Sequence, residues 1–364
     1  MKFSIVRSKF LDGLQTVQNV VTAKGSLQIL SNALLHAEGN KLCITTTDLD
    51  ISERCIVECE VEKPGSTTLP IRRLSSMIRE LDEGKILFEV TEEDVASVQC
   101  GSTYFKIIGL PMRDFPPVPP AEGKFCYRID QGAFREMLRK TCYAVSQDET
   151  RRVLNGVLLA FKENKLTMVA TDGRRLALVE HEIEFPPEAE VEMILPTKAV
   201  SELTRILGND GDLKIYAQKN QVIFELGDTV LSSKLIDGVY PNYRHVIPSA
   251  CDERVVIERE QLLAALRRVS VVTTDKSNAT RLTFSANQLI ISTNTPEVGE
   301  GRDTVPVKYA GKEISIIFNP EYVMDPLKNI DDDEVFIEMN DGHSPALLKC
   351  NVPFLYVLMP LRIS

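Results

Sequence analysis

The sequence predicts an α+β protein built from three copies of one domain. Three observations lead to this prediction: a strand and helix motif that occurs three times, a hairpin about thirty residues after each copy, and a further helix that a proline precedes or opens. Since strands follow one another without intervening helices, the sheets should be largely antiparallel. The repeat spacing divides the chain into three predicted domains, residues 1–121, 122–250 and 251–364.

The first repeated element reads as a short strand followed by an amphipathic helix. Its copies begin at Phe3, Tyr127 and Val255. Apolar residues recur in each copy at matching places, with the spacing of one helix face. The matching positions are Ile5, Ile129 and Ile257, then Phe10, Phe134 and Leu262, and then Leu14, Leu138 and Leu266.

The second repeated element is a hairpin. In each copy a polar turn that contains Asn joins two strand-like runs, which is typical of antiparallel pairs. Leu42, Leu166 and Leu289 occupy matching positions in the three copies.

The third repeated element is a helix with a proline before it or in its first turn, where the missing N–H costs nothing. Its copies begin at Leu69, Leu195 and Phe318, and alternating strands follow them. Together with the helices of the first element, the predicted helical spans are 7–20, 70–82, 131–145, 196–208, 259–272 and 319–330.

Composition excludes several classes of protein. The chain has 364 residues, of which 43% are hydrophobic and 26% are charged, so it has ample material for a folded core. No run approaches the ~18 apolar residues of a membrane span. The first residues do not read as a signal peptide, which favours a cytoplasmic protein. The eight cysteines form no CxxC pair and the four histidines lie far apart, so we expect reduced thiols, no metal site and no cofactor.

Charge is distributed unevenly along the chain. The net charge is -10, yet the six predicted helical spans hold fourteen Lys and Arg against eight Asp and Glu. One interpretation is that these are the solvated faces of amphipathic helices. The other is that equivalent helices face a common centre and form a positive lining, which would attract the phosphates of a nucleic acid without reading its sequence. Because aromatic residues do not interleave with the basic ones, duplex is favoured over single strand.

No motif for catalysis is present. The sequence lacks GxGxxG, a Walker A loop, GxSxG and HExxH. Asp48 and Asp172 occupy equivalent repeat positions, but the third copy has Thr295 there, and an Asp after a strand is common in turns. We therefore interpret both aspartates as turn residues and expect a protein that is not an enzyme.

The sequence resembles the bacterial DNA polymerase III beta subunits, the beta sliding clamps, along its whole length. Four segments carry the resemblance: MKFSIVRSKF at the start, VATDGRRLAL at 169–178, SKLIDGVYPNYRHVIP at 233–248 and YVLMPLR near the end. The resemblance implies a non-catalytic processivity factor, a head-to-tail homodimeric ring that encircles duplex DNA and slides along it. Twelve helices spaced ~9 Å apart give a circle of about 34 Å through their axes, which leaves room for a duplex after ~10 Å is subtracted for helix thickness.

The resemblance also implies partners and sites. The partners are the replicative polymerase, a clamp loader, and other polymerases and repair proteins with clamp-binding peptides. The implied peptide pocket comprises Leu154, Thr171, Gly173, Arg174, Arg175, Leu176, Pro241, His245, Val246, Val357, Met359, Pro360, Leu361 and Arg362. The implied DNA contacts are Lys24, Arg72, Gln147, Arg151, Arg152 and Lys198. The implied dimer interface comprises Arg73, Phe105, Ile107, Val271, Val272, Glu297, Glu300 and Asp303.

The sequence departs from the family pattern at several of these places. His245 stands where the family often has a basic residue, and Asp148 lies in a loop expected to approach DNA. Two alternatives therefore stay open: a repeat-built interaction scaffold that does not encircle DNA, and an enzyme with an unrecognised site. Retention on circular DNA would separate the scaffold from the clamp.

Overall fold

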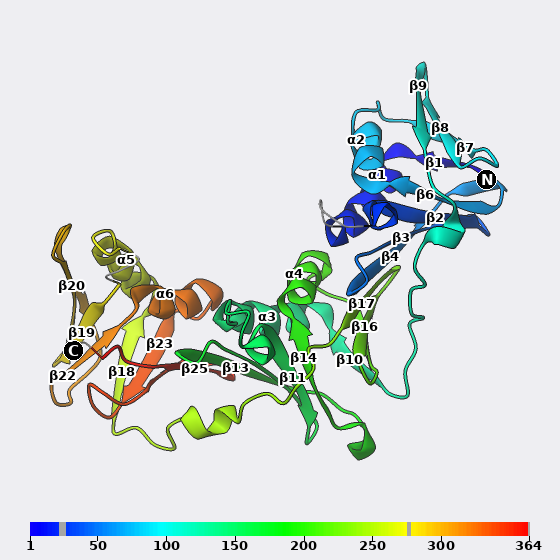
Figure 1. The fold of residues 1–364 in the computed structure, drawn as a ribbon. Coiled ribbons are helices and arrows are strands. Elements are labelled where there is room, and N and C mark those ends of the chain that lie inside the picture. The colour runs from blue at the N-terminus through cyan, green and yellow to red at the C-terminus, as the bar shows by residue number, and fades with distance from the viewer. Residues whose placement is uncertain (22–26, 275–277, 363–364) are drawn as a thin grey trace. The chain divides into compact units, whose positions relative to one another are not determined.

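The structure is a computed structural model that describes residues 1–21, 27–274 and 278–362 (Figure 1). Helices combine with antiparallel sheets, which confirms the predicted α+β class. The chain forms two compact units. One comprises Met1–Arg135 with Ser201–Leu235, and the other comprises Glu136–Val200 with Ile236–Ser364.

The six predicted helices are all present in the part of the chain that the structure describes. They are α1 (Arg7–Val17), α2 (Ile71–Arg79), α3 (Gln131–Thr141), α4 (Thr197–Ile206), α5 (Arg259–Ser270) and α6 (Pro320–Asn329). Their ends fall up to four residues inside the predicted spans. In two cases a 3-10 turn continues the helix, η1 (Gln18–Val20) after α1 and η4 (Cys142–Ala144) after α3. Such tightening of the last turn is common at helix ends.

The first unit contains two sheets. The five-stranded sheet has the order β5 (Glu60–Lys63), β1 (Lys2–Val6), β7 (Lys85–Val90), β8 (Val95–Cys100) and β9 (Thr103–Ile108). The eight-stranded sheet has the order β10 (Cys126–Asp130), β15 (Asp212–Ala217), β16 (Gln221–Leu226), β17 (Thr229–Lys234), β4 (Ile51–Glu58), β3 (Lys41–Thr47), β2 (Asn32–Glu38) and β6 (Gly65–Pro70).

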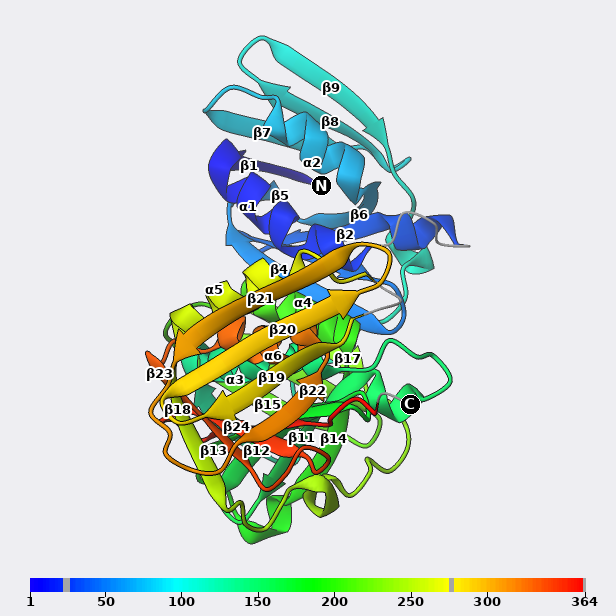
Figure 2. The ribbon, with the colours of Figure 1, turned by 90° about the vertical axis from the view of Figure 1, so that its left-hand side faces the viewer.

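The second unit also contains two sheets. Its eight-stranded sheet has the order β14 (Val191–Pro196), β11 (Gly156–Lys162), β12 (Lys165–Thr171), β13 (Arg175–Glu182), β25 (Phe354–Leu358), β24 (Ala346–Lys349), β23 (Glu334–Met339) and β18 (Glu253–Glu258). Its four-stranded sheet, which faces the viewer in Figure 2, has the order β21 (Gly299–Pro306), β20 (Gln288–Thr295), β19 (Thr280–Ser285) and β22 (Ile314–Phe318).

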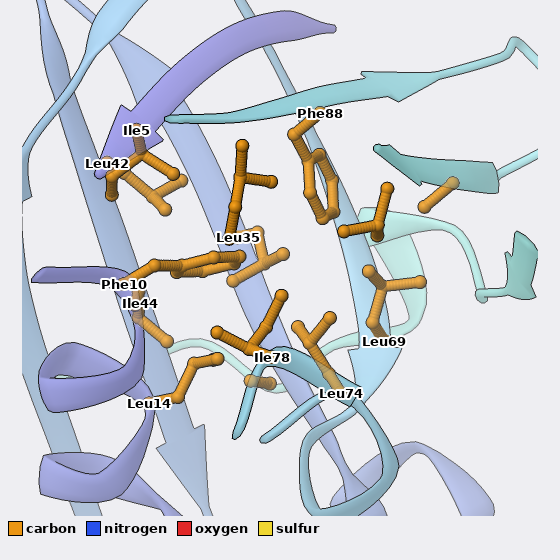
Figure 3. Close-up of a cluster of buried hydrophobic side chains, with 14 of the residues drawn as sticks. Ile5, Phe10, Leu14, Leu35, Leu42, Ile44, Leu69, Leu74, Ile78 and Phe88 are labelled. Carbon is orange, nitrogen blue, oxygen red and sulfur yellow. The ribbon is translucent and has the colours of Figure 1, made fainter. Parts of the chain in front are cut away.

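The repeated apolar positions form the cores. Leu14, Leu138 and Leu266 are all fully buried, as are Leu42, Leu166 and Leu289. Figure 3 shows the cluster of the first unit, where side chains from α1, α2 and the two sheets point toward one another. Aromatic rings complete it: Phe3 stacks on Phe88 with ring centroids 4.8 Å apart, and Phe10 meets both rings edge to face. The sequence repeat is therefore a repeat of core positions.

Each eight-stranded sheet combines strands from two of the predicted domains. β17 pairs with β4, so the Thr229 and Cys55 positions lie opposite each other. β13 pairs with β25, so Leu176 lies opposite Val357. The domain limits at 121 and 250 stay a prediction, because the compact units follow these sheets and divide the central third of the sequence between them.

A buried contact between a carboxyl group and an arginine joins α4 to β4 within the first unit. Glu53 is fully buried, and both of its carboxylate oxygens accept from Arg205 Nη2, at 3.3 and 3.2 Å. Arg205 also pairs with Glu202 at 2.8 Å and donates to the carbonyl of Thr16 at the end of α1. Burial raises the pKa of Glu53 to about 8, although Arg205 acts in the opposite direction. Glu53 therefore holds a proton in the folded protein at pH values where an unfolded chain has released it.

This proton makes the stability pH-dependent. Between pH 4.5, the ordinary value, and about 8, unfolding releases the Glu53 proton, so its contribution to the free energy of unfolding falls as pH rises. A Glu53→Gln protein cannot lose that proton. We expect its free energy of unfolding, relative to that of wild type, to be higher at pH 8.5 than at pH 5.5 by on the order of 2 kcal/mol. Chemical unfolding at the two pH values measures this difference. Glu225→Gln, in a partly exposed ion pair of the same sheet, is the control. A difference that does not change with pH would show that Glu53 stays ionised beside Arg205.

Candidate peptide-binding and DNA-facing sites

The turn between β12 and β13 carries four of the residues expected in the peptide pocket. Thr171 ends β12 and Arg175 begins β13, so Gly173 and Arg174 lie in the turn itself. Gly173 has a φ of +86°, which glycine adopts without a Cβ clash. Asp172 closes the turn, because its Oδ1 accepts the backbone N–H groups of Arg174 at 2.8 Å and Arg175 at 3.1 Å.

The equivalent aspartate of the first repeat, Asp48, closes its turn in the same way. Oδ1 of Asp48 accepts the backbone N–H groups of Asp50 at 3.0 Å and Ile51 at 2.8 Å. Both aspartates thus satisfy backbone donors at a strand end, which confirms their interpretation as turn residues.

Arg175 points into the protein. Its side chain is 10% exposed, and its guanidinium donates to Asp172 Oδ2 (3.1 Å), Asp325 Oδ2 of α6 (2.5 Å) and the carbonyl of Tyr143 (2.6 Å). It also lies over the ring of Tyr322, 4.3 Å from the centroid. These contacts occupy the guanidinium, so it has few donors left for the polar groups of a peptide.

Burial sets the electrostatics around this arginine. It raises the pKa of the hydroxyls of Tyr356 and Tyr143 well above the ordinary value for tyrosine. Burial acts to lower the pKa of Arg175, but the bond to Asp325 acts in the opposite direction, and the pKa is raised. The guanidinium is therefore a permanent cation among neutral phenols.

The floor of the expected pocket is apolar. Leu176 of β13 lies between Thr171 of β12 and Val357 of β25 in the sheet register. Leu154, Leu176 and Val357 belong to one hydrophobic cluster and are 7%, 2% and 1% exposed. The connector, defined as residues 236–251, covers this face of the sheet, because its Tyr240 belongs to the same cluster.

The rim of the expected pocket carries exposed apolar side chains. Val246 is 45% exposed and Met359 is 40% exposed. The backbone N–H of Met359 donates to the carbonyl of Arg174 at 3.0 Å, which ties the rim to the turn. A buried apolar floor beside exposed apolar side chains is typical of a docking site.

The remaining expected pocket residues lie around this rim. Pro241 is exposed two residues before η7 (Tyr243–Val246), and Nε2 of His245 lies 3.1 Å from Nδ2 of Asn242. Beyond Met359 the chain leads to another sheet, since the backbone N–H of Leu361 donates to the carbonyl of Ile317 in β22. Pro360 is half-buried and Arg362 is exposed.

One hollow brings expected DNA contacts and expected peptide contacts together. Gln147 and Arg151 line it from the loop before β11, and Arg174 and Arg175 line it from the turn. Sequence reasoning missed the residues that hold this hollow together, Tyr143, Tyr322 and Asp325, since only the fold brings them to Arg175.

The other expected DNA contacts are dispersed. Lys24 lies outside the described residues. Arg72 of α2 is exposed, and its Nη2 donates to the carbonyl of Val21 at 2.9 Å. Arg152 is exposed at the start of η5 (Arg152–Leu154), and Lys198 lies in the first turn of α4.

Within their observed bounds the described α-helices are more basic than predicted. They carry fourteen Lys and Arg side chains against six Asp and Glu, because the shorter α2 excludes Glu80 and Asp82. Arg73 and Arg79 of α2 are exposed, and neither forms an ion pair with the described part of the chain. The remainder of this acidic protein carries the negative charge.

Two sheets end in edge strands near the expected interface residues. β9 is one edge of the five-stranded sheet, whose other edge is β5, and β21 is one edge of the four-stranded sheet, whose other edge is β22. On β9 the exposed apolar residues are Tyr104 (59%) and Ile108 (75%), whereas Phe105 is half-buried and Ile107 is 4% exposed. Ile107 therefore has almost no surface to offer a partner, because alternate residues of this strand face its own core.

The other interface candidates differ in their exposure and in their contacts within the chain. Val271 is 78% exposed, whereas Val272 packs against Gly301, whose added Cβ would lie 3.2 Å from it. Glu297, Glu300 and Arg73 are exposed. Asp303 is already paired with Arg268 at 2.6 Å, and backbone and Arg268 bonds lower its pKa against the effect of burial.

No cluster of His, Cys, Asp and Glu suited to a metal occurs among the described residues. All eight cysteines are free thiols, and burial raises the pKa of Cys59 and of Cys350 to about 11. None of the described helices is long and apolar enough to cross a membrane.

Comparison with known proteins gives one family over the whole chain. Models of the N-terminal, central and C-terminal domains of the DNA polymerase III beta subunit match residues 1–119, 128–242 and 244–362. The beta sliding clamp of Pseudomonas aeruginosa is 34% identical, with all of both chains covered. That of Chlamydia muridarum is 33% identical, with all of this chain and 99% of the relative covered.

Solved structures agree with this. The Pseudomonas aeruginosa sliding clamp bound to griselimycin matches with a TM-score of 0.96 at 34% identity, and the Bacillus subtilis DNA polymerase sliding clamp matches with a TM-score of 0.96 at 26% identity. All of both chains is covered in each case. From its sequence and its fold alike, the chain belongs to the DNA polymerase III beta subunit family, the beta sliding clamps.

Proposed function

We propose that this member of the beta sliding clamp family closes as a homodimer into a ring around duplex DNA. As the processivity factor of a DNA polymerase, it tethers the replicative polymerase to its template. Topology then replaces tight binding, because a closed ring cannot leave a closed circle. The protein acts in the cytoplasm as an accessory subunit without catalysis of its own, and a clamp loader opens the ring.

The two edge strands are the observation that best supports closure. An edge strand exposes unpaired N–H and C=O groups, so it is a ready template for another chain. β9 presents Tyr104 and Ile108, and Val271 is exposed just after α5. Pairing β9 of one protomer with β21 of its partner covers apolar side chains and gives hydrogen-bond partners to the free backbone groups of both edge strands. Because each protomer has one edge of each kind, two head-to-tail contacts close the ring.

The basic helices support a DNA-facing role. Phosphate attraction depends on charge and not on sequence, and it weakens steeply with salt. Arg72, Arg73, Arg79 and Arg152 are exposed on a chain with a net charge of -10. An acidic protein with basic helices attracts duplex weakly at those helices and repels it elsewhere, which suits sliding.

The peptide pocket supplies the tether. Leu176 and Val357 form an apolar floor, and Met359 and Val246 form an exposed rim. Solved clamps of Pseudomonas aeruginosa and Bartonella birtlesii are described with griselimycin bound. One groove per protomer makes the polymerase, the loader and repair proteins compete for it.

Loaded protein is expected to stay on closed circular duplex and to leave once the plasmid is linearised. Binding to a short linear duplex should be weak and should fall steeply between 50 and 200 mM salt, as counterion release requires (roughly tenfold or more). Gel filtration of loaded plasmid before and after cutting measures retention. An Arg152→Ala protein should load or bind more weakly while keeping its dimer mass. Loss from circular and linear plasmid at the same rate would favour the scaffold interpretation over the ring.

A further inference from the structure

Two pairs of adjacent arginines, Arg151 with Arg152 and Arg174 with Arg175, lie on the segments that form the hollow beside the peptide pocket, and all but Arg152 line it. The resemblance assigned the first pair to DNA and the second pair to the peptide. In the structure each pair contains one arginine bound to its own chain and one without such a bond. The side chains of Arg152 and Arg174 make no hydrogen bond or ion pair with the described residues, whereas Arg151 and Arg175 make several.

Arg151 reaches from its loop to the pocket turn. Its Nη1 donates to the backbone carbonyl of Asp172 at 2.9 Å. Its Nε donates to Oδ2 of Asp148 at 3.0 Å, and its Nη2 lies 3.4 Å from the hydroxyl of Ser146. The side chain is therefore oriented from its own loop and bound to the turn at its far end.

Arg175 binds the same residue from the other side. Its Nε donates to the side chain of Asp172 at 3.1 Å, and its Nη1 anchors to Asp325 of α6. Asp172 thus receives one arginine on its carbonyl and another on its carboxylate. Gly173 follows directly, and a Cβ there would lie 3.1 Å from Arg151 Nη1, so the arginine packs against the turn itself.

We propose that Arg151 and Arg175 are positioning residues of the peptide pocket, which hold the turn 171–175 between them in the form that a partner peptide meets. This inference rests on the proposed function of the pocket. The turn supplies Thr171, Gly173 and Arg174 to the pocket, and the Arg174 carbonyl accepts the N–H of Met359 on the rim. A shift of Asp172 therefore moves the turn and the rim together.

The proposal reassigns Arg151. Its three bonds to its own chain use the donors that a DNA phosphate would need, whereas Arg152 keeps its donors for DNA. One loop thus has two roles: its Arg152 contacts the duplex, and its Arg151 holds the peptide pocket. The free Arg174 is the arginine that meets the peptide's polar groups, in place of Arg175.

The test is the affinity of a labelled clamp-binding tail peptide of a replicative polymerase, measured by fluorescence anisotropy on the intact protein without DNA. Arg151→Ala should bind about tenfold more weakly, since a charge-assisted hydrogen bond to the turn is lost. Arg151→Lys, which keeps the charge and a single donor nitrogen, should recover part of the loss. Arg152→Ala should keep the peptide affinity of wild type and bind DNA more weakly, and Arg113→Ala, 84% exposed in the other unit, is the neutral control.

The outcomes separate this inference from the pocket assignment. A Leu176→Ala, Met359→Ala protein must lose the peptide in the same assay, and if it does not, the pocket itself is misplaced. If that protein loses the peptide while Arg151→Ala binds like wild type, the positioning role is wrong and the pocket stands. Equal losses for Arg151→Ala and Arg152→Ala would show a general electrostatic effect and would also overturn the proposal. Thermal midpoints and dimer mass, measured for every variant, exclude unfolding as the cause.

Discussion

A Val271→Asp protein is expected to be a folded monomer. Val271 is 78% exposed in the single chain, so an aspartate there costs the isolated fold little. In the proposed ring the same carboxylate becomes buried without a partner, which costs on the order of 3 kcal/mol at each of the two contacts. Every 1.4 kcal/mol is about a tenfold change, so each contact should weaken by about a hundredfold or more. Light scattering at low micromolar concentration measures the mass, and retention on circular plasmid should be lost with it.

The control for this prediction replaces another exposed valine. Val239 lies on the connector and is 89% exposed, so Val239→Asp adds the same charge away from both edge strands and should stay dimeric. Ile108→Asp should behave like Val271→Asp, because Ile108 lies on the opposing edge. A Val271→Asp protein that stays dimeric would mean that this surface is not the interface. Val272 is a poorer choice, since it packs on Gly301 of its own chain.

Replacing Leu176 and Met359 together by alanine is expected to abolish peptide binding at ordinary concentrations. Binding energy concentrates in a few buried contacts, and truncating a central one costs ~2 kcal/mol or more. Two such losses correspond to about a thousandfold if they add. Leu176 supplies the floor at 2% exposure and Met359 the rim at 40%. Titration of a polymerase tail peptide into both proteins measures the effect.

The double variant must be shown to be folded before its loss of peptide affinity is interpreted. Met359→Ala alone removes a half-exposed side chain and should leave the thermal midpoint near that of wild type, while its affinity falls about thirtyfold. Leu176→Ala opens a cavity in the cluster with Leu154 and Val357, and some loss of stability is expected. If wild type and a folded, dimeric double variant bind the peptide with equal affinity, the pocket assignment is wrong. The proposed ring is unaffected by that result.

The sequence by itself determined the class of fold and the positions of the core. Leu14, Leu138 and Leu266 align by repeat spacing and are all fully buried. The spacing is informative because helix and strand periods place side chains on one face regardless of what that face meets. The helices begin within a residue of their predicted starts for the same reason. Pro70, Pro196 and Pro320 stand just before or at the first residue of α2, α4 and α6, where a backbone donor is not needed. The turn role of Asp172 could also be predicted from the sequence, because its side chain binds only the backbone of its own neighbours in that role.

Only the tertiary structure decided which of two like neighbours performs a role. Ile107 and Ile108 are both apolar, yet one is 4% and the other 75% exposed, because the strand's core face is set by the sheet that it joins. Arg151 and Arg152 are chemically identical, and so are Arg174 and Arg175. They differ because residues far away in the chain bind only one member of each pair: the carbonyl of Asp172 accepts from Arg151, and the carboxylate of Asp325 accepts from Arg175. Such choices depend on long-range contacts that no local period encodes, since a sequence pattern fixes which face a residue occupies but not which partner that face will meet.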